Sequence, residues 1–309
     1  MMKKHHAPEL PPVEALRLED LAGVESLELR GRLLAEGFLA GIHRSGRSGS
    51  CPEFREFRAY VPGDEPRRID WRASARSDSV LLRLREEESN LRAKIILDSS
   101  RSMAFRGEKA LFSKWDYART LAAALAWILH RQQDLCGLDV VGAELEASFP
   151  YSSRRSALTR MIASLERAAS GKESAVGAHL LNFAAKQELS HGILIVLSDF
   201  YMKTRELEEA LLCFRGTGNQ VLLFQILDPG ELALEYTRST QLLELEGEEN
   251  RFTVHPDLDA EAYEARMEKH LQSLADAASG SGTDWSLCRT DMLPMQALEK
   301  ILSASKRRR

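Results

Sequence analysis

The chain has 309 residues, of which 44% are hydrophobic and 28% are charged, so it can bury a sizeable core. Its formal net charge of −4 gives no global basis for binding nucleic acid, which usually needs a basic domain or patch. The four cysteines are far apart and show no CxxC spacing, which argues against a zinc site and is typical of reduced thiols in a cytoplasmic protein.

The chain begins with a segment that predicts no regular structure. Residues 1–12 (MMKKHHAPELPP) lack the hydrophobic region of a signal peptide, and we expect them to be disordered. Between residues 16 and 39, apolar side chains recur at helical spacing, which predicts one or two helices. A Gly- and Ser-rich turn region, GIHRSGRSGSCPEF, follows these helices.

The next segment, YVPGDEPRRIDWRASAR, is dense in charge. Pro62 and Gly63 predict a turn, and the alternation of Ile69 and Trp71 with charged residues predicts an extended segment anchored by those two side chains. Two roles stay open for the charged and aromatic residues here: a buried ion-pair network that holds the segment in place, or a surface for an acidic or mixed-charge partner. The residues concerned are Arg58, Tyr60, Asp64, Arg68, Asp70, Trp71 and Arg76.

From about residue 92, short apolar strands alternate with helices. The predicted strands are 94–98, 135–141, 144–149, 192–197, 220–227 and 285–289, with a hairpin over 241–254. The predicted helices are 114–133, 156–169, 177–188, 205–214, a long helix after DLDAE, and 296–302. Continuously apolar strands separated by helices predict a parallel sheet covered on both faces.

The expected fold class is therefore α/β: a doubly wound, mostly parallel, Rossmann-like sheet over residues 92–304. Residues 13–91 are too short and too charged for a separate globule, so we expect an N-terminal arm packed on this domain. Residues 305–309 form a basic tail. The most apolar run, TLAAALAWILH, is too short to cross a bilayer, so we expect no membrane span and leave peripheral association open.

Polar residues follow two of the predicted buried strands. ILDSSRSM places Asp98, Ser100 and Ser102 in one strand-to-helix turn, and in LIVLSDF Asp199 stands close behind its strand. In open parallel sheets, ligands bind beyond the carboxyl ends of the strands. Oxygen donors of this kind suit a hard cation such as Mg²⁺, and Ser174 is a candidate for a further hydroxyl. The alternative is that Asp98 caps the turn and the serines satisfy backbone groups.

Motifs of several enzyme classes are absent from the sequence. The first strand ends in DxS where a haloacid dehalogenase phosphatase would have DxD, and there is no P-loop, GxGxxG or GxSxG motif. The histidines do not have metalloprotease spacing. We therefore expect no enzymatic activity. A metal-dependent hydrolase, in which Asp98 and Asp199 position a water, is the alternative.

Two groups of motifs resemble known families. The DxSxS strand end, the hydroxyl of Ser174 and Asp199 resemble the metal-ion-dependent adhesion site of von Willebrand factor A domains, where Thr is usual in place of Ser174. EFREFRAYVPGDEPRRIDWRASAR, together with the later LSDF, LDPGE and RTD, is similar to the bacterial family catalogued as domain of unknown function 58. This second resemblance runs from about residue 41 to residue 302.

The resemblance implies a von Willebrand factor A-like fold and a bound Mg²⁺ or Mn²⁺. It implies that Ser100, Ser102 and Ser174 contact the metal directly, whereas Asp98 and Asp199 act mostly through water. Members of the family look like von Willebrand A proteins encoded beside MoxR-type AAA+ ATPases. The implied role is a cytoplasmic, non-enzymatic adaptor or chaperone-like partner of such an ATPase, acting on an unknown client and completing the metal shell with a partner's acidic side chain.

Overall fold

The computed structural model describes most of the larger part of the chain and pieces of its N-terminal part. The described residues are 16–44, 57–61, 69, 71–75, 77, 79–83, 91–108, 110–171, 174–202, 204–233, 240–243, 251–254, 256–294 and 297–300. The segments expected to be disordered or a basic tail lie outside these ranges. So do four residues of the charged segment, Asp64, Arg68, Asp70 and Arg76.

The chain divides into two compact units. The larger unit comprises Met1–Phe38 and Leu91–Arg309, and the smaller unit comprises Leu39–Asn90. The N-terminal helical residues up to Phe38 lie in the larger unit, together with residues 91–309. The expectation that the rest of the arm packs on the sheet stays a prediction.

The N-terminal helices are α1 (Leu18–Ala22) and α2 (Leu27–Arg44). They form because apolar residues recur on one face, and Leu27 and Leu34 on that face are fully buried. Gly31 permits close packing against helix α4 (Lys114–Arg131), since a methyl group at Gly31 would lie 2.6 Å from the Cβ of Ala123. The N-terminal helices are thus part of the packed core.

The smaller unit contains two short antiparallel strands, β1 (Phe57–Ala59) and β2 (Leu81–Arg83), and a one-turn helix, α3 (Trp71–Ser74). The Tyr60 N–H donates to the Val80 carbonyl over 2.7 Å and extends the strand pair. The extended segment predicted around Trp71 is wrong for residues 71–74, which are helical. Trp71 is 68% exposed and is not the buried anchor that the alternation suggested.

The larger unit is built on a six-stranded sheet. Its strands are β3 (Arg92–Asp98), β4 (Leu135–Val141), β5 (Leu145–Ser152), β6 (Ile193–Ser198), β7 (Gln220–Leu227) and β10 (Asp284–Arg289). The strand order is β10-β7-β6-β3-β4-β5, and every neighbouring pair is parallel except β4 and β5. This is the doubly wound order with one antiparallel edge strand, so the predicted fold class is confirmed.

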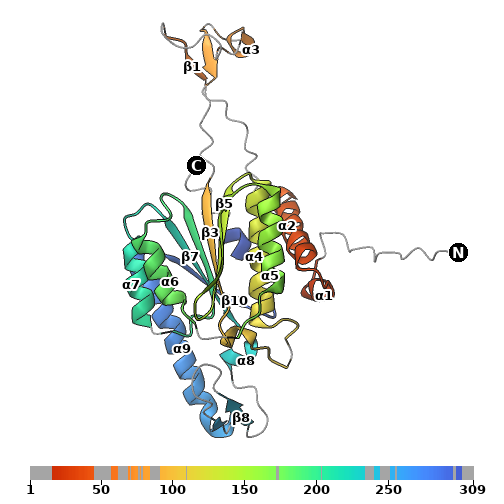
Figure 1. The fold of residues 1–309 in the computed structure, drawn as a ribbon, viewed down its shortest axis with the longest axis vertical. Helices are drawn as coiled ribbons and strands as arrows, with labels where there is room; N and C mark the ends of the chain where they lie inside the picture. Colours follow the sequence, from red (N-terminus) through yellow and green to blue (C-terminus); the bar gives the residue numbers. More distant parts are fainter. Residues whose placement is uncertain are drawn as a thin grey trace, which may run out of the picture. The chain divides into compact units, whose positions relative to one another are not determined.

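Helices cover both faces of this sheet. They are α4, α5 (Arg155–Arg167), α6 (Val176–Ala185), α7 (Thr204–Phe214) and α9 (Pro256–Ser281). Figure 1 shows α4 and α5, with α2 beside them, on one side of the sheet, and α6, α7 and α9 on the other. The strands β3, β6 and β7 are largely apolar because helices bury them on both faces, although Lys94 in β3 and Gln225 in β7 are buried too.

Shorter elements complete the larger unit. The predicted hairpin is present as β8 (Thr240–Leu243) and β9 (Arg251–Val254), and residues 297–300 are helical. A 3-10 turn, η3 (Ser102–Ala104), follows β3, and a one-turn helix, α8 (Pro229–Leu232), follows β7. Within the described ranges, no helix combines the length and the apolar character that crossing a bilayer requires.

Candidate functional site

The candidate site lies where the order of the strands reverses, between β3 and β6. Asp98 is the last residue of β3, and Asp199 directly follows β6. The two strands are parallel neighbours, with Leu97 opposite Leu197, so their polar ends lie at the same edge of the sheet. Both carboxylates are buried, at 0% exposure for Asp98 and 1% for Asp199. This is the position at which doubly wound sheets bind ligands.

Asp98 is held by donors from three segments. Its Oδ1 accepts the Ser100 N–H over 2.9 Å, and its Oδ2 accepts the hydroxyls of Ser198, over 2.5 Å, and of Ser174, over 3.3 Å. Ser198 was not selected from the sequence, although it directly precedes Asp199. Burial, followed by the charge of Asp199, raises the pKa of Asp98 to about 7.

The two serines after β3 lie side by side. The Oγ atoms of Ser100 and Ser102 are 3.1 Å apart, because the 3-10 turn that starts at Ser102 folds the chain back over the end of the strand. Ser100 is fully buried and Ser102 is 7% exposed, while Arg101 between them is exposed to solvent. The structure therefore joins Asp98, Ser100, Ser102 and Ser174 into one hydrogen-bonded group.

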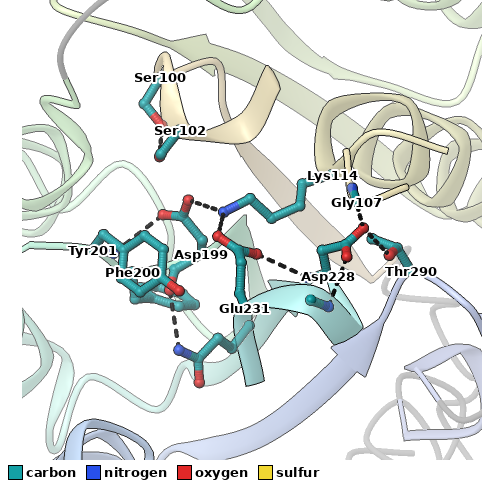
Figure 2. A network of polar contacts seen from close by, with 12 residues as sticks. Ser100, Ser102, Gly107, Lys114, Asp199, Phe200, Tyr201, Asp228, Glu231 and Thr290 are labelled. Atoms are coloured by element: carbon teal, nitrogen blue, oxygen red, sulfur yellow. Dashed lines mark hydrogen bonds and ion pairs between the residues drawn. The ribbon is translucent and has the colours of Figure 1, made fainter. Parts of the chain in front are cut away.

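A buried lysine is the main feature that sequence reasoning missed. Lys114 opens helix α4 after the N-cap Ser113 and has 0% exposure. Its Nζ donates to Asp199 Oδ2 over 2.8 Å and to Glu231 Oε1 over 2.6 Å (Figure 2). It also lies 4.8 Å from the ring centroid of Tyr201, within the range of a cation–π contact. Burial alone would lower the pKa of Lys114, but the two carboxylates outweigh burial and raise it.

Glu231 is oriented toward this lysine by a capping box in α8. The N-cap residue Asp228 accepts the Gly230 N–H over 2.9 Å, and Glu231 Oε2 accepts the Asp228 N–H over 2.9 Å. Asp228 Oδ2 also accepts the Gly107 N–H and the Thr290 hydroxyl, each over 3.1 Å (Figure 2). Residues of the LDPGE and RTD motifs thus hold the Glu231 carboxylate in contact with the Lys114 ammonium. Burial raises the pKa of Glu231 despite the lysine.

Asp199 is held by an unusual turn after β6. Phe200 is fully buried and has φ 57°, a conformation that costs a bulky residue roughly 1–2 kcal/mol. The turn lets the Phe200 N–H donate to Ser198 Oγ over 2.9 Å and the Tyr201 N–H donate to Asp199 Oδ1 over 3.1 Å. One oxygen of Asp199 therefore accepts a backbone N–H, and the other accepts the lysine.

The donors fit a divalent cation on one side of the site only. Asp98, Ser100, Ser102 and Ser174 supply oxygen atoms, which Mg²⁺ and Mn²⁺ prefer. On the other side, the ammonium already neutralises Asp199. Within the described ranges, no three His, Cys, Asp or Glu side chains gather as a metal site. A cation here would depend on the hydroxyls and on Asp98.

Three of the residues singled out in the charged segment are described, all within the smaller unit. Tyr60 and Trp71 are described within the smaller unit, and the backbone of Arg58 lies in β1. Whether these residues contact a partner or serve only the fold stays a prediction, as it does for the residues of this segment outside the described ranges.

Comparisons with known proteins place the chain among uncharacterised relatives. The family described as "Protein of unknown function DUF58" matches residues 56–273. "Uncharacterized protein Mb1516" of Mycobacterium bovis is 26% identical over 274 residues, covering 87% of this chain and 84% of that protein. "Uncharacterized protein Rv1480" of Mycobacterium tuberculosis gives the same identity and coverage.

Solved structures are also similar to this chain. The conserved hypothetical protein BatB from Bacteroides thetaiotaomicron is 17% identical, with a TM-score of 0.49, covering 70% of this chain and 99% of that one. The SpRpn10 VWA domain is 10% identical, with a TM-score of 0.38, covering 65% of this chain and 88% of that one.

Proposed function

This chain belongs to the family described as Protein of unknown function DUF58, and we propose that it is a non-enzymatic adaptor that binds an acidic side chain of a partner protein. The binding site is the hydrogen-bonded group of Asp98, Ser100, Ser102 and Ser174 at the end of β3, which we call the strand-end group. We further propose that this group holds Mg²⁺ or Mn²⁺, and that the partner is a MoxR-type AAA+ ATPase that acts with this protein on a client in the cytoplasm.

One observation carries the proposal: the hydroxyls of Ser100 and Ser102 lie 3.1 Å apart beside a carboxylate at the carboxyl edge of the sheet. Asp98, Ser100, Ser102 and Ser174 would hold the metal. A bound cation would supply positive charge that an Asp or Glu of the partner can neutralise. Arg101 is exposed between the two serines and adds a positive charge at the rim, which favours an acidic partner.

The environment of the two aspartates supports binding over hydrolysis. A general base must reach the proton it removes, but Asp98 and Asp199 are 0% and 1% exposed. Protein donors contact both oxygens of each carboxylate, and Lys114 neutralises Asp199. The hydrolase alternative predicts turnover of phosphate esters by the purified chain, with loss of turnover in Asp98→Asn. We expect no turnover.

The partner assignment rests on the family resemblance and is tested by co-purification. Tagged full-length protein is mixed with the MoxR-type ATPase of the same genome in MgCl₂ or in EDTA. We expect capture in MgCl₂ and its loss in EDTA, in Asp98→Asn and in Ser102→Ala. The matched control is Ser148→Ala, because Ser148 donates over 2.7 Å to a different buried aspartate, Asp139. Capture that survives both EDTA and Asp98→Asn would contradict the metal-bridged mechanism.

A further inference from the structure

Lys114 places a permanent positive charge beside the strand-end group. Its ammonium is fully buried and bridges Asp199, which follows β6, and Glu231, in α8 after β7. Three carboxylates, those two and Asp98, therefore share this edge with one lysine. The lysine neutralises the carboxylate that the family resemblance assigns to the metal's outer shell.

The ammonium is held where it is by several elements. Lys114 is the first residue of α4, and its backbone N–H donates to the Phe105 carbonyl over 3.0 Å. Glu231 is fixed by its capping box, and the ring of Tyr201 lies 4.8 Å from the lysine Nζ (Figure 2). Moving the lysine away would leave the buried carboxylate of Asp199 and the largely buried one of Glu231 without a counter-cation, which is strongly unfavourable. A metal at the site must therefore bind with Lys114 in place.

The charges then decide how tightly the metal binds. Lys114 cancels one of the three carboxylate charges at this edge, so a divalent cation on Asp98 and the serine hydroxyls would be attracted less strongly than it would be without the lysine. A carboxylate brought by a partner would restore that negative charge. Because coupling between two ligands is reciprocal, the metal and the acidic partner would each tighten the binding of the other.

From this geometry we propose that Lys114 is a tethered counter-cation that holds the site together without metal and keeps Mg²⁺ binding weak until a partner carboxylate arrives. The inference rests on the proposed function, because it concerns the same site. It adds how metal binding is regulated: without its partner the protein is mostly metal-free, and the partner's carboxylate completes the metal site.

The test is titration of the full-length chain with MgCl₂ alone. Calorimetry and the shift in melting temperature measure the binding of Mg²⁺. Lys114→Met should bind Mg²⁺ at least about tenfold more tightly than the wild type, because the repelling charge is gone. The matched control is Lys94→Met, which removes another buried lysine paired with a carboxylate, Asp139, over 2.6 Å at the far end of β3. This control should leave Mg²⁺ affinity unchanged.

A second variant covers the case in which Lys114→Met does not fold. Lys114→Gln removes the same positive charge but keeps an amide that can donate to Asp199 or Glu231, so it too should bind Mg²⁺ more tightly than the wild type. Unchanged or weaker affinity in the folded variants would overturn the inference. If the wild type already binds Mg²⁺ equally tightly and capture stays EDTA-sensitive, the inference fails alone. If no variant binds Mg²⁺ and the Asp98→Asn variant still captures the ATPase, the proposed function fails as well.

Discussion

Replacing Asp98 by Asn should stabilise the metal-free protein while it removes the proposed binding function. Burial and the charge of Asp199 raise the pKa of Asp98 from 3.8 to about 7, so the folded state disfavours the ionised carboxylate. Asn is close to the protonated acid in shape. Its oxygen can accept the Ser100 N–H, and its amide can donate to the hydroxyls of Ser198 and Ser174.

The direction in which wild-type stability changes with pH follows from proton binding by Asp98. Between pH 3.8 and about 7 the folded state binds this proton and the unfolded state does not, so wild-type stability falls as pH rises through that window. A shift of roughly 3 pKa units corresponds to at most about 4 kcal/mol at high pH. About half of this loss has occurred at about pH 5.5, so a further loss of about 2 kcal/mol is expected between there and about pH 8.5.

Urea unfolding in EDTA at these two pH values, for the wild type and Asp98→Asn, measures the effect. The stability of the variant relative to the wild type should increase by about 2 kcal/mol from the lower to the higher pH. Using this increase cancels any packing cost of Asn that does not depend on pH. A difference that stays constant with pH would refute the view that Asp98 is a strained, buried carboxylate.

Three further predictions concern the elements around the site, and each is measured by urea unfolding. Lys114→Met should lose about 3–5 kcal/mol of stability, because it leaves the buried Asp199 and the largely buried Glu231 without a counter-cation; a loss under about 1 kcal/mol would mean that the ion pairs are not formed in solution. Gly31→Ala should lose about 1–3 kcal/mol, since its methyl would lie 2.6 Å from the Cβ of Ala123, whereas Gly41→Ala in the same helix has open space and should gain up to about 1 kcal/mol. Equal effects of the two glycine changes would contradict the packing of α2 on α4. Asp228→Ala should lose about 2–4 kcal/mol, as three donors lose their acceptor, and a neutral result would show that the capping box of α8 is dispensable.

The sheet was predictable because its central strands are short, mostly apolar runs bounded by turns. The predicted strands 135–141 and 220–227 coincide with β4 and β7, since runs this rich in apolar residues favour burial on both faces. The start of α9 was misplaced after DLDAE, because the helix begins at Pro256, a residue suited to the first turn. The helix at residues 71–74 was missed because alternation over so few residues does not distinguish a strand from a short helix.

The site was predictable only where its residues are close in sequence. Asp98, Ser100 and Ser102 share one turn, and their spacing alone predicts neighbouring oxygens. Lys114 is separated by 85 residues from Asp199, and in the sequence it is simply the first residue of an amphipathic helix. For Glu231 a signal existed: DPGE reads as a capping box, although that pattern does not say what the glutamate faces.

The strand-end edge thus has two halves with different chemistry. On one side, Lys114, Asp199 and Glu231 form a buried ion-pair network that is complete without any ligand. Such networks contribute little net stability compared with apolar packing, so we infer that this one fixes the position of Asp199. On the other side, Ser102 is 7% exposed and Ser174 is partly exposed, and both offer oxygen atoms that carry no charge. Counting Asp98, three carboxylates share this edge with one lysine, so the empty site is negative and repels an acidic partner. A bound divalent cation would offset that negative charge and leave coordination positions for a carboxylate of the partner. An acidic partner would then recognise the loaded site and not the empty one.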